Sequence, residues 1–120
     1  EFQVSTLAQP IAPALLDIFV GESLKVPAKV WRATFREFLD TDFSADLGRI
    51  TAPTLVIWAD KDGFSRRQER DALAAGIRGS IVKDYTGAGH AMHWEEPARV
   101  ARDVAGFVAG LPAAASRRSR

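Results

Sequence analysis

Two aspartates and a histidine are the side chains whose types and positions suit chemistry. Asp60 and Asp62 follow the apolar stretch from Pro53 to Ala59, and His90 ends the glycine-containing loop Thr86-Gly87-Ala88-Gly89-His90. A carboxylate beside an imidazole holds one tautomer and stabilises the imidazolium, which leaves the other ring nitrogen to act as a base. The spacing does not decide which aspartate has this role, because an aspartate after a strand often only forms the turn.

The elements around these residues predict a parallel sheet. Thr54 to Trp58 is a short, continuous apolar run, typical of a strand that is covered on both faces. Ser65 and Gln68 fit a capping box that opens a helix ending near Gly76. Ser80 to Tyr85 is predicted to form the next strand. In a parallel sheet both strands end at the edge where ligands bind, so we expect the acid and the histidine to meet there.

A last helix is predicted to open at Pro97 and to end at Gly110 and Pro112. It carries a stripe of apolar residues: Val100, Val104, Phe107, Val108 and Leu111. We interpret Glu95 and Glu96 as acidic residues at the start of this helix, where negative charge complements the helix dipole. The order of strand, helix, strand and helix indicates the α/β class.

The first part of the chain is predicted to be helical. Pro13 can open a short helix that runs to Val20, and Gly21 is expected to weaken or end it. Such a helix, bounded by proline and glycine, suits either a small core or a lid over a cleft, and the sequence leaves both alternatives open.

Three aromatic residues share one face of the next predicted helix, which opens at Pro27. Trp31, Phe35 and Phe38 follow at spacings of four and three residues. Core packing is the expected role of this stripe, and contact with a substrate is the alternative.

The composition excludes several classes of function. A formal charge of +1 gives no global attraction to nucleic acid or to an anionic membrane, and the absence of cysteine excludes disulfides. No apolar run reaches the roughly 18 residues of a membrane span. We find no signal peptide and expect a cytoplasmic protein. The first residue is Glu1 rather than Met, so we expect the chain to be part of a longer protein.

A nucleophile is missing from the recognisable motifs. No serine lies in a G-x-S-x-G turn, which would expose it between a strand and a helix. The serines are Ser5, Ser23, Ser44, Ser65, Ser80, Ser116 and Ser119. His90 and His93 have a spacing that suits a metal, but no third ligand is evident, so no metal site is predicted.

Two stretches together resemble the α/β-hydrolase fold family. Residues 50–62, ITAPTLVIWADKD, are similar to its acid-bearing strand and turn, whose usual pattern is I-x-x-P-x-L-x-x-x-G-x-x-D. Ala59 stands where the family commonly has glycine. Residues 86–90, TGAGH, with Glu-Glu-Pro at 95–97, resemble the family's histidine loop and the opening of its final helix. The resemblance covers residues 24–111 and is nearest to the single-lid bacterial branch of esterases, enol-lactone hydrolases and carbon–carbon bond hydrolases.

The resemblance implies a division of the chain and a set of roles. Residues 1–48 would be part of a helical lid, residues 49–112 the C-terminal part of the α/β-hydrolase core with its last two parallel strands, and residues 113–120 a disordered basic tail. Asp62 would be the acid and His90 the base of a Ser-His-Asp triad, while Asp60 falls on a variable position of the motif.

The expected function is hydrolysis of an ester-like bond in a small molecule, without a cofactor. In this family the nucleophile, usually serine, lies earlier in the chain than the acid and the histidine. Trp31, Phe35 and His93 are the candidates for contact with the substrate. The alternative is an inactive half-fold that binds a ligand, self-associates through its open strand edges or pairs with a missing N-terminal half.

Overall fold

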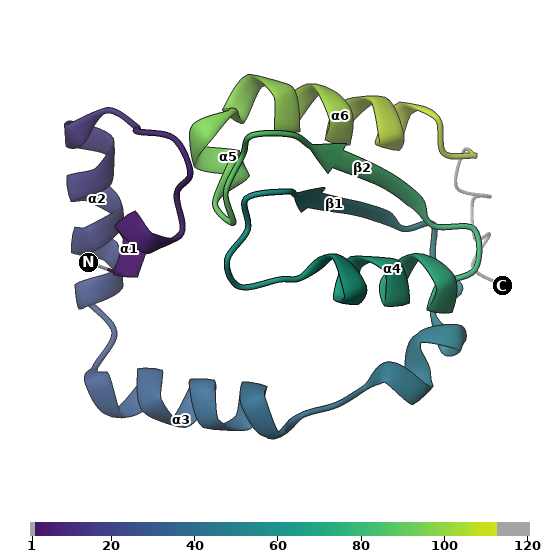
Figure 1. Ribbon diagram of the computed structural model, residues 1–120, viewed down its shortest axis with the longest axis horizontal. Helices are drawn as coiled ribbons and strands as arrows, with labels where there is room; N and C mark the ends of the chain where they lie inside the picture. The colour runs from purple at the N-terminus through teal and green to yellow at the C-terminus, as the bar shows by residue number, and fades with distance from the viewer. Residues whose placement is uncertain (1, 113–120) are drawn as a thin grey trace, which may run out of the picture.

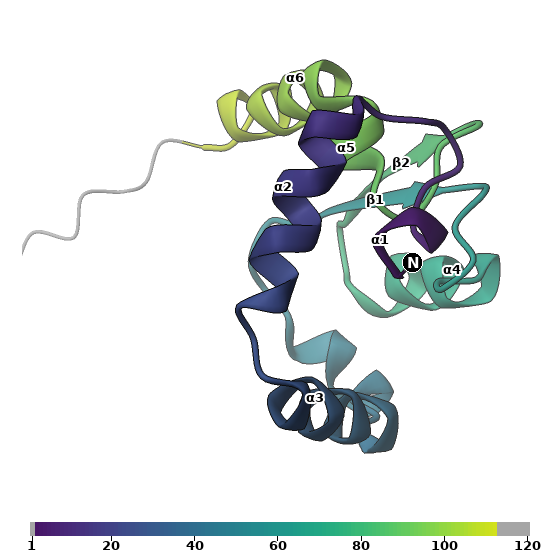
Figure 2. The same cartoon turned by 90° about the vertical axis from the view of Figure 1, so that its left-hand side faces the viewer.

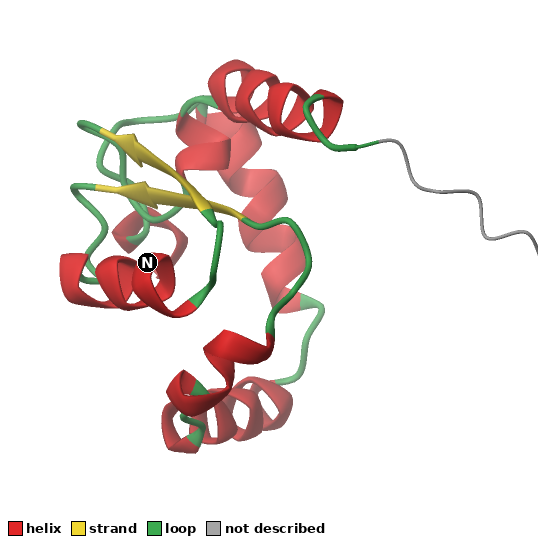
Figure 3. Cartoon of the chain, turned by 90° about the vertical axis from the view of Figure 1, so that its right-hand side faces the viewer, coloured by secondary structure: helices red, strands yellow, loops and turns green. Residues whose placement is uncertain are grey.

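The computed structural model describes residues 2–112, so the predicted basic tail at 113–120 lies outside the described residues. The helices and strands follow one another along the chain (Figures 1 and 3): α1 (Phe2–Ser5), α2 (Pro13–Leu24), α3 (Ala28–Asp40), the 3-10 helix η1 (Ser44–Arg49), β1 (Leu55–Ala59), α4 (Arg67–Gly76), β2 (Ile81–Tyr85), α5 (Met92–Glu95) and α6 (Pro97–Ala109). Within residues 2–112, none of the helices has the length and apolar character needed to cross a membrane.

The sheet consists of β1 and β2, which pair in parallel with Leu55 opposite Ile81 and Ala59 opposite Tyr85. Helix α4 lies on one side of the two strands and α6 on the other (Figure 1). Neighbouring residues of a strand point to opposite faces, so Asp84 reaches α4 while Tyr85 reaches α6. The strand-and-helix order therefore predicted the α/β class correctly.

Tyr85 is the centre of the face that α6 covers. Its side chain is buried and packs in a small core with Ala59 and Ala88. Its hydroxyl donates a hydrogen bond of 2.6 Å to Asp103, and the guanidinium carbon of Arg99 lies 3.8 Å from the ring centroid. Burial, followed by the hydrogen bond to the Asp103 carboxylate, raises the pKa of Tyr85 to about 12.

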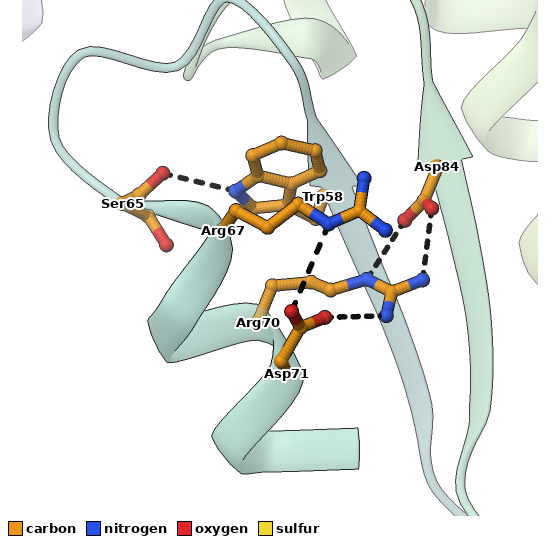
Figure 4. Close-up of polar contacts among 6 residues, drawn as sticks. All are labelled: Trp58, Ser65, Arg67, Arg70, Asp71 and Asp84. Carbon is orange, nitrogen blue, oxygen red and sulfur yellow. Dashed lines mark hydrogen bonds and ion pairs between the residues drawn. The ribbon is translucent and has the colours of Figure 1, made fainter.

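An ion pair fastens α4 to the opposite face of the sheet (Figure 4). Arg70 donates two hydrogen bonds, of 2.9 and 2.8 Å, to the carboxylate of Asp84 and a third, of 2.8 Å, to Asp71. Beside it, the Trp58 indole N–H donates to the backbone oxygen of Ser65 at 2.9 Å. The ion pair joins β2 to α4, and the Trp58 contact joins β1 to the loop that leads into α4. The hydrogen bonds to Asp84 raise the pKa of Arg70.

Helix α2 continues through Gly21, so the prediction that this glycine ends the helix is wrong. A glycine inside a helix costs about 1 kcal/mol relative to alanine but leaves the backbone N–H in place, so the helix can pass through it. The helix ends at Leu24, shortly before Pro27.

Helix α4 begins at Arg67, so the predicted cap at Ser65 is also wrong. The backbone N–H of Ser65 instead donates to the carboxylate of Asp62 at 3.1 Å. The helix uses a glutamate for its cap, because Glu69 accepts a hydrogen bond from the backbone N–H of Arg66. The end near Gly76 agrees with the prediction.

Helix α3 lies away from the two strands in both Figure 1 and Figure 2. Every one of its residues is exposed. Phe38 keeps 71% of its surface accessible, and Trp31 and Phe35 keep 37% and 43%. The expectation that these aromatics pack in the core is therefore wrong for the described residues, because the contacts that α3 makes with the other N-terminal helices leave all three side chains exposed.

Candidate active site

Three hydrogen bonds donated by backbone N–H groups join the loop that follows β1 to the end of β2 and the loop after it, at the carboxyl edge of the sheet. The backbone N–H groups of Asp60 and Lys61 donate to the carbonyl oxygens of Tyr85 and Ala88 at 3.0 and 3.1 Å. The N–H of Gly87 donates to the carboxylate of Asp60 at 2.6 Å. Gly87 has a φ of 84°, a conformation that glycine adopts without strain. The two loops therefore lie side by side.

Asp62 and His90 meet across these loops. The Nδ1 atom of His90 lies 2.9 Å from Oδ2 of Asp62. The other carboxylate oxygen accepts the backbone N–H groups of Phe64 and Ser65, at 2.8 and 3.1 Å. The Asp62 side chain is only 3% exposed, whereas that of His90 is 50% exposed. The Asp62 carboxylate is thus fixed by backbone N–H groups of its own turn, and it binds Nδ1 of the His90 ring, which is accessible to solvent.

This arrangement has a defined chemical capacity. A carboxylate accepts hydrogen bonds, so the ring donates through Nδ1 and its Nε2 is left with a free lone pair. Such an imidazole can take a proton from a hydroxyl group, and the buried carboxylate stabilises the charge that the ring gains. Within residues 2–112, the contact with Asp62 is the one side-chain hydrogen bond of His90.

The two aspartates that the sequence left as alternatives have different contacts. Asp62 faces His90, and Asp60 joins the two loops through Gly87. Both positions use an acidic side chain as a hydrogen-bond acceptor, which is why residue type and proximity to the strand did not distinguish them.

Aromatic rings connect His90 with a pocket among the N-terminal helices. The Phe64 ring lies 5.3 Å from the His90 ring and 5.8 Å from that of Phe2, which in turn lies 6.1 Å from Phe35. The pocket has a volume of about 340 Å³ and mostly apolar walls. It is lined by Phe2, Gln3, Val20, Ser23, Leu24, Trp31 and Phe35.

His93, the third residue expected to contact a substrate, is not part of the pocket lining. Its ring lies 5.2 Å from that of Trp94. Desolvation, followed by the charge of His90, lowers the pKa of His93. Among residues 2–112, the histidine, aspartate and glutamate side chains form no group of three that could hold a metal ion.

Glu95 has contacts that the sequence did not reveal. It lies in α5 rather than at the start of α6, so its interpretation as a charge at the start of that helix is wrong. Its carboxylate accepts the backbone N–H groups of Ala8, Gln9 and Gly89, at 2.6, 3.2 and 2.8 Å. No local pattern predicts such bonds, because two of the partners lie 87 and 86 residues away in the chain.

Comparison with known proteins finds similar sequences, among them a hydrolase and a lipase. The chain is 32% identical over 110 residues to a 2-hydroxy-6-oxononadienedioate/2-hydroxy-6-oxononatrienedioate hydrolase of Paraburkholderia xenovorans (strain LB400), covering 90% of the chain but 37% of that protein. It is 24% identical over 105 residues to monoacylglycerol lipase abhd6-A of Xenopus laevis, covering 88% of the chain and 31% of that protein. No protein-family model matches the chain.

A solved structure shares the fold. The crystal structure of a membrane phospholipase A, described as a bacterial virulence factor, superposes with a TM-score of 0.68 and 27% identity. The match covers 88% of this chain and 35% of that structure. The chain belongs to the α/β-hydrolase family, and its two parallel strands with their flanking helices correspond to the C-terminal part of that fold. The chain spans between 31% and 37% of the length of these three proteins.

Proposed function

We propose that this chain supplies the acid and the base of a Ser-His-Asp triad in a hydrolase that cleaves an ester-like bond. The single observation that carries the proposal is the 2.9 Å contact between His90 Nδ1 and Asp62 Oδ2 at the end of two parallel strands. The hydrolase names of the relatives support the same class of reaction. Asp62 orients the ring of His90, and Nε2 serves as the base.

The reaction needs a hydroxyl nucleophile, which we place in a part of the natural polypeptide outside these 120 residues. Its oxygen forms a bond to the carbonyl carbon while its proton moves to Nε2 of His90. The imidazolium then returns that proton to the departing alcohol oxygen as the carbon–oxygen bond breaks. Water attacks the resulting acyl group by the same route, and His90 again takes and returns the proton. No cofactor enters these steps.

The substrate that we propose is a small molecule with an apolar part. The pocket beside Phe2 has apolar walls, and Trp31 and Phe35 lie in its lining, so they would contact that part. His93 follows His90 by three residues and would contact the substrate closer to the reacting bond. In this proposal residues 1–48 act as a lid over the site, and the protein is cytoplasmic.

A fluorophosphonate probe, which reacts with activated serines, tests the proposal when the intact mass is read. We expect no mass shift for the 120-residue chain alone. We expect a shift for the natural polypeptide that contains these residues, lost in His90→Ala and kept in the control variant Asp60→Asn, because Asp60 contacts Gly87 rather than His90. A shift that persists in His90→Ala would overturn the role of His90. A shift in the 120-residue chain itself would overturn the location of the nucleophile.

A second candidate function is association without catalysis. Large apolar side chains are exposed along the N-terminal helices, including Ile18, Leu24, Phe38 and Leu39, and β1 pairs with a neighbour on one edge only within the described residues. Such surfaces favour a second copy or a polypeptide that extends the sheet. Light scattering of the 120-residue chain over a wide concentration range should then show dimers or larger species. A monomer throughout would remove this candidate.

A further inference from the structure

Residues 6–9 dock directly on the histidine loop. The carbonyl oxygen of Thr6 accepts the N–H of Ala91 at 3.0 Å, and the side-chain amide of Gln9 donates to the carbonyl oxygen of Gly87 at 3.0 Å. Thr6 is buried. In Figure 1 the connection between α1 and α2 runs beside α5. The segment therefore contacts the histidine loop on both sides of His90 in sequence.

The carboxylate of Glu95 lies between segment 6–9 and the histidine loop. Oε1 accepts the N–H groups of Ala8 and Gln9, and Oε2 accepts the N–H of Gly89, the residue before His90. One carboxylate thus binds three backbone donors from two stretches of chain. Hydrogen bonds to an ionised acceptor are roughly twice as strong as neutral ones, so this group can fix both stretches together.

The approach of the two stretches is close enough to require a glycine. A Cβ atom at position 89 would lie 2.5 Å from the backbone nitrogen of Ala8 and 2.7 Å from the carbonyl oxygen of Thr6. No side chain fits there without moving segment 6–9. The same Cβ would lie 2.8 Å from Oε1 of Glu95, so the main chain before His90 is in direct contact with both segment 6–9 and the Glu95 carboxylate.

A second contact relates the same segment to the catalytic pair. Segment 6–9 directly follows α1, whose Phe2 ring packs 5.8 Å from Phe64, and Phe64 packs 5.3 Å from the His90 ring. On the other side of the segment, Phe19 of α2 stacks on Trp94 of α5 at 4.0 Å. Both helices flanking the segment thus contact the surroundings of His90.

We propose that Glu95 is a positioning residue for His90. By holding the Gly89 amide, it fixes the backbone from which the imidazole reaches Asp62, and by holding Ala8 and Gln9 it couples the N-terminal helices to that position. The proposal rests on the role of His90 as the base, which was proposed above. It goes beyond that role because it assigns the orientation of the ring to a contact between two distant parts of the chain.

The isosteric variant Glu95→Gln tests this. Glutamine keeps the shape but replaces one acceptor oxygen with an NH₂ donor, so one set of backbone N–H groups loses its partner. The matched control is Glu96→Gln, because Glu96 is the neighbouring glutamate and pairs with Arg99 on the surface of α6 at 3.1 Å. Two properties are measured by NMR in the 120-residue chain: hydrogen exchange of the Ala8 and Gly89 amides, and the low-field Nδ1–H resonance of His90.

We expect Glu95→Gln to speed exchange of the Gly89 amide about tenfold or more, the size expected when a backbone donor loses its acceptor. We expect it also to broaden or remove the Nδ1–H resonance, while Glu96→Gln changes neither. If Glu95 has only a structural role, Glu95→Gln will speed exchange of the Gly89 amide but leave the Nδ1–H resonance of His90 as in the wild type. This result would overturn the proposal.

A second variant covers the case in which Glu95→Gln does not fold. Ala8→Pro removes one donor from segment 6–9 and leaves the Glu95–Gly89 hydrogen bond possible. It should weaken the His90 Nδ1–H resonance if segment 6–9 is coupled to the ring, and an unchanged resonance would contradict the coupling. These readouts need no turnover, so they can fail while the fluorophosphonate test succeeds, and the reverse also holds.

Discussion

The C-terminal unit, residues 55–109, and the N-terminal helices, residues 2–40, are built in different ways. In the C-terminal unit two helices cover a sheet, and Ala59, Tyr85 and Ala88 are fully or almost fully buried. In the N-terminal helices the whole of α3 is exposed. The acid and the histidine come entirely from the first region, whereas the apolar pocket comes from the second. The difference indicates that the proposed acid and base are built on the packed C-terminal unit, whereas the proposed substrate surface depends on how the N-terminal helices dock.

The largest difference in stability is expected between two variants, each of which replaces one aromatic residue, one from each region. Tyr85→Ala should lower the free energy of unfolding by about 3–5 kcal/mol, because it empties a buried site. Phe38→Ala, at an exposed position of α3, should change it by about 0.5 kcal/mol or less. Urea denaturation of both variants measures the difference. Similar losses in the two variants would show that the regions do not differ in this way.

Alkaline pH should act on the C-terminal unit through the same tyrosine. Burial and the hydrogen bond to Asp103 raise the pKa of Tyr85 from 10.0 to about 12, so its contribution to stability is complete below pH 10 and is lost as the pH rises toward 12. Tyr85 is the only tyrosine of the chain, so tyrosinate absorbance reports on it alone. The titration midpoint should be near 12 when folded and near 10 in urea. Equal midpoints would contradict the buried hydrogen bond.

The variant Tyr85→Phe separates the alkaline loss of stability that belongs to Tyr85 from the loss caused by other titrating groups. This variant keeps the ring and removes the hydroxyl, so it should cost about 1 kcal/mol at neutral pH. It should also lack the part of the alkaline loss that belongs to Tyr85. An alkaline stability profile identical to that of the wild type would assign the loss to other residues.

A smaller effect is expected at the α4 face. Arg70→Ala removes the paired hydrogen bonds to Asp84 and should lower the urea midpoint modestly, because the pair is partly exposed. Arg67→Ala is the control on the same helix, where the contact with Asp71 is 3.7 Å long and exposed. It should change the midpoint less. The opposite order would show that the Arg70–Asp84 pair does not hold α4 to β2.

The sequence predicts the strands and helices of the C-terminal unit well, because the residues that determine each element lie within or beside it in the chain. The apolar run before Asp60, the turn residues after each strand and Pro97 at the start of α6 lie within a few residues of the features they determine. The meeting of Asp62 and His90 was also expected, since parallel strands end at the same edge.

The remaining features depend on contacts that sequence spacing does not encode. Glu95 is one of two adjacent glutamates, and only the folded chain shows that it binds residues 8 and 9 rather than serving α6. The stripe of Trp31, Phe35 and Phe38 has the spacing of a buried helix face, but spacing does not show whether another element covers it. Ser65 does not cap α4, because the helix begins at Arg67 with Arg66 at the cap position, and the Ser65 N–H donates to Asp62 instead.

The most direct test of the central claim compares the two aspartates of one turn in the natural polypeptide that contains these residues. Asp62→Asn should lower kcat/KM for a p-nitrophenyl ester by roughly 10³–10⁴-fold, because an amide no longer fixes the imidazole tautomer. Asp60→Asn keeps the oxygen that accepts the Gly87 N–H, so it should remain close to the wild type. Equal losses in both variants, or full activity in Asp62→Asn, would contradict the assignment of Asp62 and His90 as the catalytic pair.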